Sequence, residues 1–170
     1  MRILFAMGYT TEFNGRFDLD RPLTKEHAAY LAQFSETRRM SRDSEVIGKL
    51  PDPLREAVGL PLGPQACYYV GSMESFGQDR VGVADYNDPP EGQPGLWCQW
   101  VPTQDSKGLE WNGAEKFYYY VEWLEYLIEH FLEPWGYTLN GVVMWEGEEE
   151  DDLGTIRVED NFVSAEGHAE

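Results

Sequence analysis

The sequence predicts an α+β protein with a mostly antiparallel sheet of about four to five strands and two main helices on one face. Two segments of helical period and several short strand-like segments support this class. Their order is strand, helix, irregular segment, two strands, helix, two strands. A ferredoxin-like fold or a related two-layer sandwich has such an order.

The first half of the chain begins with one predicted strand and one predicted helix. Residues 11–19 alternate between two faces, with Phe13 and Phe17 on the same face, which is typical of a half-buried strand. Residues 25–39 have the helical period. Thr24, directly before them, is a residue type that commonly caps a helix N-terminus.

A long irregular segment follows at residues 50–95 and is rich in proline and glycine. Within it we expect a short helix at 53–58 and short strands at 67–70 and 81–86. Its aromatic residues indicate that it packs against the rest of the protein. Loops of this length inside a domain are uncommon and are often functional.

The second half contains the clearest helix. Residues 115–134 place apolar side chains at helical spacing. Two short strands are predicted before this helix, at 97–101 and 109–111. Two more are predicted after it, at 137–146 and 155–162, as a hairpin with an acidic connection.

The termini and the apolar runs define the expected domain and location. We expect a single domain over residues 7–163, an N-terminal extension at 1–6 and a flexible C-terminal tail at 164–170. A length of 170 residues fits one domain. No apolar run approaches the ~18 residues that span a bilayer. We therefore expect a cytoplasmic protein without a membrane partner.

The negative charge is concentrated in one part of the chain. The sequence has 31 Asp and Glu against 13 Lys and Arg, a formal net charge of −18. Residues 1–70 contain equal numbers of both signs, so the whole net charge lies in residues 71–170. Bare nucleic acid requires positive charge, so it is not expected as a direct partner. The acidic half indicates either an interaction surface or a surface that maintains solubility.

The leading candidate site is acidic. Four glutamates recur at spacings of three, four and four residues in the second predicted helix, which places them along one side. An acidic turn follows one strand later. We expect these residues to bind a basic protein surface; the alternative is a solvated helix face and a solvated turn. The candidates are Glu122, Glu125, Glu129, Glu133, Glu148, Glu149, Glu150, Asp151 and Asp152.

A second candidate is a basic cluster at the end of the first predicted helix. Arg38, Arg39 and Arg42 lie within five residues and beside hydroxyl side chains. Such a cluster binds phosphate or carboxylate groups, so a small anionic ligand, such as a nucleotide, is the alternative partner. The same arginines are equally suited to capping the helix or pairing with the acidic half.

The aromatic residues are expected mainly in the core. Six tryptophans are present, and a minority of them are expected to anchor an interface. Three consecutive tyrosines, Tyr118, Tyr119 and Tyr120, cannot all face inward from one helix. We expect Tyr119 to lie at the surface.

Neither a cofactor nor a metal is expected. The acidic turn lacks the alternating ligands of a calcium loop. Cys67 and Cys98 lie in apolar runs, which indicates buried thiols. The histidines are scattered, and no phosphate-binding loop or nucleophile motif is present. We favour a non-enzymatic protein, although the abundant carboxylates leave an acid–base pair open.

Three segments resemble small hypothetical proteins of bacteria and their phages. They are MGYTTEF at 7–13, FSETRRM at 34–40 and LWCQWVP at 96–102. The resemblance implies a phage or mobile-element origin and the cytosol of a bacterial host, and it assigns no residue a role. Acidic inhibitors of CRISPR or restriction nucleases are common in that setting. We therefore expect an acidic inhibitor that mimics nucleic-acid charge and blocks a basic surface of a defence complex.

Overall fold

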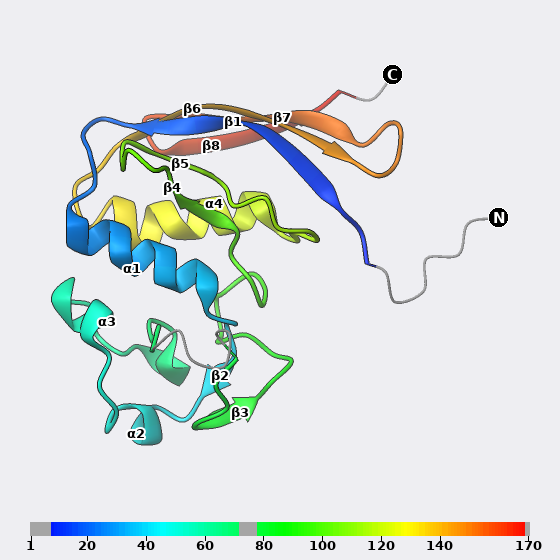
Figure 1. Ribbon diagram of the computed structural model, residues 1–170. Helices are drawn as coiled ribbons and strands as arrows, with labels where there is room; N and C mark the ends of the chain where they lie inside the picture. Colours follow the sequence, from blue (N-terminus) through cyan, green and yellow to red (C-terminus); the bar gives the residue numbers. More distant parts are fainter. Residues whose placement is uncertain (1–7, 72–77, 169–170) are drawn as a thin grey trace.

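The protein is an α+β structure built on one antiparallel sheet. The computed structural model describes residues 8–71 and 78–168 (Figure 1). Six strands pair in the order β4-β5-β1-β6-β7-β8. Their bounds are β1 Thr11–Leu19, β4 Trp100–Pro102, β5 Gly108–Trp111, β6 Leu139–Gly147, β7 Leu153–Glu159 and β8 Phe162–Gly167. The α+β class is confirmed, and the predicted count of four to five strands is too low.

Strand β1 holds the middle of the sheet. It pairs with β6 over its whole length, from Thr11 opposite Gly147 to Leu19 opposite Leu139, and with β5 through Phe17 opposite Leu109. Its side chains alternate between the two faces of the sheet, as the sequence predicts. Phe17 is fully buried, and its neighbours on either side are not.

Helices α1 (Lys25–Glu36) and α4 (Tyr120–Leu127) cover one face of the sheet, and no helix lies on the other face within the described chain (Figure 1). Thr24 caps α1 as expected, since its side chain accepts a hydrogen bond of 3.1 Å from the backbone of His27. The helix ends at Glu36 and not at residue 39, because Thr37 has an extended backbone.

The second predicted helix, 115–134, begins later and changes type. Lys116 and Tyr119 have left-handed backbone conformations, with φ of 61° and 58°, so the helix starts only at Tyr120. After α4 the chain continues as a π-helical turn, η3 (Ile128–Leu132). Both helices bury a continuous aromatic and aliphatic core against the sheet, including Phe34, Trp100, Trp123, Leu124, Phe131 and Val143.

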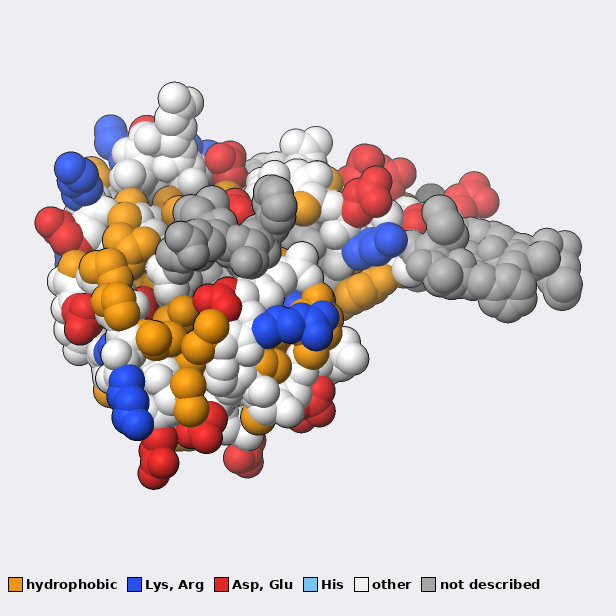
Figure 2. Space-filling model, turned by 60° about the horizontal axis from the view of Figure 1, so that its bottom comes forward, with side chains coloured by type: hydrophobic (Ala, Val, Ile, Leu, Met, Phe, Trp, Pro, Cys, Tyr) orange, Lys and Arg blue, Asp and Glu red, His pale blue; other side chains and the backbone are white. Residues whose placement is uncertain are grey.

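Residues 37–71 and 78–97 form a connecting lobe between α1 and β4. It contains a two-stranded sheet of β2 (Ser41–Arg42) and β3 (Val83–Asp85). Its helical turns are α2 Ser44–Ile47, α3 Pro53–Ala57 and η1 Pro64–Ala66. The expected strand at 67–70 is not a strand. Figure 2 turns this lobe toward the viewer and shows hydrophobic side chains grouped on one side of it.

The C-terminal strands account for the difference in strand count. The expected strand at 155–162 is divided by a two-residue turn, because Asp160 and Asn161 both have positive φ and connect β7 directly to β8. Strand β8 includes residues that we expected in a flexible tail at 164–170. With β7 and β8 added and the lobe inserted, the sheet is not clearly ferredoxin-like. The predicted extension at 1–6 lies outside the described residues.

Candidate functional site

The four glutamates of the predicted acidic helix face are all exposed. Glu122 and Glu125 lie on α4, Glu129 lies on η3, and Glu133 directly follows it. The ion pairs between described residues are Arg16–Asp18, Arg16–Asp105, Arg21–Asp20 and Arg55–Asp52. None of them includes a glutamate of this helix, so the negative charge of the helix face is not offset by an adjacent base.

The π turn interrupts the regular spacing of these glutamates. The backbone N–H of Glu133 donates to the carbonyl of Ile128 at 2.8 Å, a bond that spans five residues where an α-helix spans four. The turn is therefore wider, and Glu133 is displaced around the axis from the position that the α-helical period predicts. The acidic face is a band along the helix and not a straight row.

The acidic residues of the turn between β6 and β7 differ in their hydrogen bonds and exposure. The hydroxyl of Tyr9 donates to Asp152 Oδ2 at 2.7 Å, and the indole N–H of Trp145 donates to Oδ1 at 3.0 Å. Glu148 accepts a hydrogen bond of 2.8 Å from the backbone of Thr10. Asp152 is half-buried and ties the turn to the start of the described chain. Glu150 and Asp151 are exposed.

The turn and the helix face meet at the start of α4. The pKa of Tyr120 is raised to about 12, first by burial and then by the negative charges of Asp152 and Glu122. Tyr120 and Asp152 also line one shallow cavity, together with Tyr9 and Tyr119. The structure therefore brings the acidic turn to the N-terminal end of the acidic helix face, while Glu133 lies at its other end.

The arginines of the basic cluster make contacts inside the protein. Arg39 is 2% exposed, stacks on Phe34 at 4.1 Å, and donates from Nη2 to the carbonyl of Cys67 at 2.8 Å. Its Nε donates to Gln93 at 3.3 Å, and its buried Nη1 has no hydrogen-bond partner in the described chain. Burial lowers the pKa of this arginine.

The other two arginines hold the second half of the connecting lobe. Arg42 is buried and donates to the carbonyls of Val81 and Asp79, both at 2.6 Å. Arg38 donates to the carbonyl of Tyr86 at 3.1 Å and to Asn87 Oδ1 at 3.2 Å. Arg38, Arg42 and these partners all lie within the lobe, so the contacts join its two segments and leave less of the cluster for an external anion.

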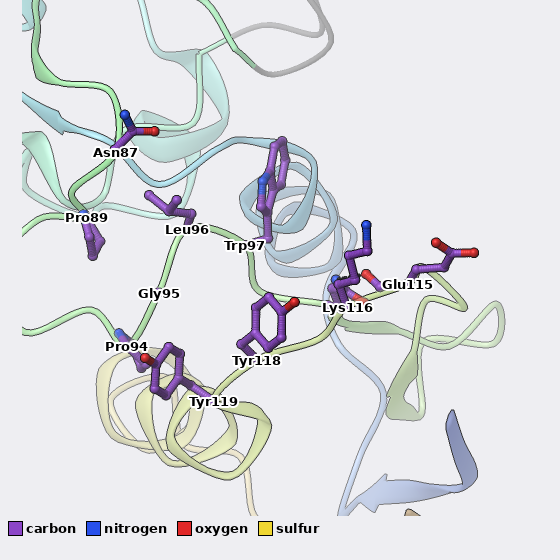
Figure 3. Close-up of a pocket in the computed structure, with 11 residues that line it drawn as sticks. Asn87, Pro89, Pro94, Gly95, Leu96, Trp97, Glu115, Lys116, Tyr118 and Tyr119 are labelled. Carbon is purple, nitrogen blue, oxygen red and sulfur yellow. Dashed lines mark hydrogen bonds between the residues drawn. The ribbon is translucent and has the colours of Figure 1, made fainter. Parts of the chain in front are cut away.

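A cavity of 530 Å³ lies where the lobe meets the segment before α4 (Figure 3). This size is within the range of ligand pockets. In the view of Figure 3, Trp97 stands above Tyr118, Pro94 and Tyr119 lie together at the lower left, and Gly95 lies on the chain between Leu96 and Pro94. The remaining lining residues are Asn87, Pro89, Leu96, Gln99, Glu115 and Lys116. No pattern in the sequence predicts this cavity.

The left-handed residues shape one wall of this cavity. Because the helix starts only after Tyr119, the rings of Tyr118 and Tyr119 project from an irregular segment and are 46% and 58% exposed. The expected surface position of Tyr119 is confirmed. A Cβ added to Gly95 would lie 3.1 Å from the Tyr119 ring and 3.6 Å from the indole nitrogen of Trp123. The run of three tyrosines is the one sequence feature that pointed to exposed rings in this segment.

The described residues contain neither a candidate metal site nor a membrane-spanning helix. Within residues 8–71 and 78–168, no group of three or more His, Cys, Asp and Glu residues is placed to hold a metal ion. No helix in the same described ranges has the length and apolar character to cross a membrane. Comparison with protein-family models, curated proteins and solved structures gave no significant match.

Proposed function

We propose that this protein is a non-enzymatic interaction protein that binds a basic, nucleic-acid-binding surface of another protein. The observation that carries the proposal is the exposed band of Glu122, Glu125, Glu129 and Glu133, which has no ion pair to any described residue. The exposed Glu150 and Asp151 lie in the turn that begins beside it. We infer that together they form one acidic surface.

The electrostatics favour a partner over a structural role for this band. Like charges three or four residues apart on a helix cost about 0.2–0.5 kcal/mol per pair. A helix that served only the fold would offset this cost with lysine or arginine. A basic groove that binds the phosphates of a nucleic acid would gain from the same carboxylates. Within this class of partner, the resemblance to phage proteins points to a nuclease of a CRISPR or restriction system.

The test is a matched pair of charge reversals. The partner is captured from a lysate of the source organism, purified, and titrated with the protein at several salt concentrations. In Glu125→Lys with Glu129→Lys, we expect the affinity to fall about tenfold or more. A control with the same change in net charge, Glu159→Lys with Glu166→Lys on β7 and β8, should change it much less.

Competition with nucleic acid completes the test. The DNA or RNA that the purified partner binds should displace the protein, and affinity should fall steeply as salt increases. Equal affinities for the two double variants would contradict the proposal. So would a partner that holds its nucleic acid and this protein at the same time.

A further inference from the structure

Three aromatic rings at the cavity beside Gly95 are without aromatic partners. The described chain contains many ring–ring contacts and five arginine–ring contacts, and these involve most of its aromatic side chains. None involves Trp97, Tyr118 or Tyr119. All three rings line the cavity, and Tyr118 and Tyr119 are 46% and 58% exposed, so a ligand in the cavity would contact them.

The polar groups of these rings are also largely unused. The hydroxyl of Tyr118 accepts a hydrogen bond of 3.0 Å from the backbone of Tyr9. No hydrogen bond within the described ranges involves the side chain of Trp97 or of Tyr119. Figure 3 shows Trp97, Tyr118 and Tyr119 around this cavity, so a ligand in it would meet these rings.

The charge around the cavity favours a cation. Glu115 lines the cavity, and Glu122, the first glutamate of the acidic band, lies three residues after Tyr119. The whole chain has a net charge of −18, which repels anions at long range. Glu115 and Lys116 are the only charged residues among the described lining residues and offset each other, so the preference for a cation comes from the charge around the cavity. Aromatic rings grouped around a cation stabilise it through their negative faces.

We propose that this cavity receives an arginine side chain of the basic partner, as an anchor beside the acidic band. This inference rests on the proposed function and specifies the chemistry of the partner at one point. A guanidinium group is planar, stacks on aromatic faces and is less strongly hydrated than an ammonium group, so it fits this site better than lysine. The cavity is larger than one side chain, and residues next to the arginine in the partner enter with it.

The protein already contains this type of contact. Five arginines of the described chain stack on aromatic rings, with 4.1 to 4.9 Å between the guanidinium carbon and the ring centroid. Arg38 and Arg80 both stack on Tyr86, and Asn87, the next residue in the chain, lines the cavity. Arginine–ring stacking is therefore compatible with the polarity of this region.

The first test uses three short peptides that differ at one residue. Acetyl-Gly-Arg-Gly-amide is titrated into the ¹⁵N-labelled protein, and the indole N–H signal of Trp97 is followed by NMR. The lysine peptide and the citrulline peptide, which has the shape of arginine without its charge, are the controls. We expect citrulline to bind about five- to thirtyfold more weakly than arginine. Equal binding of the citrulline peptide would overturn the proposal.

Variants of the lining residues test whether the peptide binds in this cavity and whether the cavity prefers a cation. Trp97→Ala and Tyr119→Ala should each weaken binding of the arginine peptide, while Phe162→Ala, which removes an exposed ring on β8, should not. Tyr119 is 58% exposed, so its variant should fold even if the Trp97 variant does not. Lys116→Gln should strengthen binding and Glu115→Gln should weaken it. The opposite signs would show that the cavity binds an anion.

Binding of the purified partner separates this inference from the proposed function. If Tyr119→Ala and the acidic double reversal both weaken binding, both are supported. If the reversal weakens binding and Tyr119→Ala does not, the anchor is wrong and the proposed function stands. If neither weakens binding, the proposed function itself is wrong.

Discussion

The sheet with its two helices and the connecting lobe are stabilised in different ways. The sheet and helices share one large apolar core that includes Trp100, Trp123 and Phe131, all buried. The lobe has a separate apolar cluster of Ile47, Ala66 and Tyr69. Val70 of the lobe also belongs to the large core, and Leu54 and Tyr68 pack against it. Within the lobe, arginine side chains donate hydrogen bonds to backbone carbonyls.

This difference predicts two levels of stability. Burial of apolar surface is non-directional and is shared by many residues, so the sheet and helices should unfold together. Residues 79–87 of the lobe are held by directional hydrogen bonds, including those from Arg38 and Arg42. Such a segment can open locally when some of these bonds are lost. The candidate surfaces divide in the same way, because the acidic band lies on the helix layer and the cavity lies at its border with the lobe.

The largest effect should follow removal of a core ring. Trp100 is 1% exposed and packs edge-on against Phe13, Phe17 and Phe117, with its indole N–H donating to the carbonyl of Tyr120 at 2.8 Å. Trp100→Ala should lower the free energy of unfolding by about 3–5 kcal/mol. Denaturant unfolding should show one cooperative transition at a lower midpoint. A loss confined to the lobe would contradict the proposed division.

A smaller and local effect should follow removal of an arginine of the lobe. Arg42→Met keeps an apolar stem against Tyr69 but leaves the carbonyls of Val81 and Asp79 without their donor. Loss of such bonds costs about 1–3 kcal/mol. Hydrogen exchange should increase in residues 79–87, while exchange in β1 and β6 stays unchanged. A midpoint as low as that of Trp100→Ala would show that the lobe and the sheet form one unit.

Much of the sheet and helix layer could be predicted from the sequence, and little of the lobe could. The alternation around Phe17 and the cap at Thr24 are local patterns, so β1 and the start of α1 were predicted correctly. Arg39 and Arg42 resemble a surface cluster in the sequence. Their burial depends on carbonyls of Cys67, Val81 and Asp79, which come from irregular chain that no periodicity places.

The candidate sites follow the same division. The exposure of the helical glutamates could be predicted from the helical period, but the π turn after Leu127 could not. The bonds of Asp152 to Tyr9 and Trp145 join residues that are distant in sequence. The cavity combines residues 87–99 with 115–119, and its shape depends on the left-handed Tyr119, which an α-helical pattern does not reveal.

Two histidines give a pH test of the same comparison. Nδ1 of His130 lies 2.7 Å from the hydroxyl of Tyr68 in the lobe, while Nδ1 of His27 lies 2.8 Å from Tyr137 in the main core. Burial lowers the pKa of both below 6.5. The folded state therefore disfavours their protonation, so this stability is present above pH 6.5 and is lost as the pH falls through the lowered pKa values.

Hydrogen exchange at pH 7 and pH 5 should separate the two histidines. Acid should expose the lobe around Tyr68 in the wild type, and His130→Gln should remove that pH dependence while His27→Gln should retain it. If His27→Gln removes it instead, the contact between η3 and the lobe is not what acid weakens.

The smallest effect concerns the acidic band. Glu125 has Glu122 and Glu129 as like-charged neighbours on its helix, so Glu125→Gln should raise the free energy of unfolding by about 0.2–0.5 kcal/mol at low salt. Glu166→Gln on β8, which has no such helical neighbours, should change it less. Thermal melts at low and high salt would measure both. A gain at Glu125 would mean that the band costs stability, which fits a surface that serves a partner. A loss would instead assign this glutamate a role in the fold and remove the main support for the proposed interface.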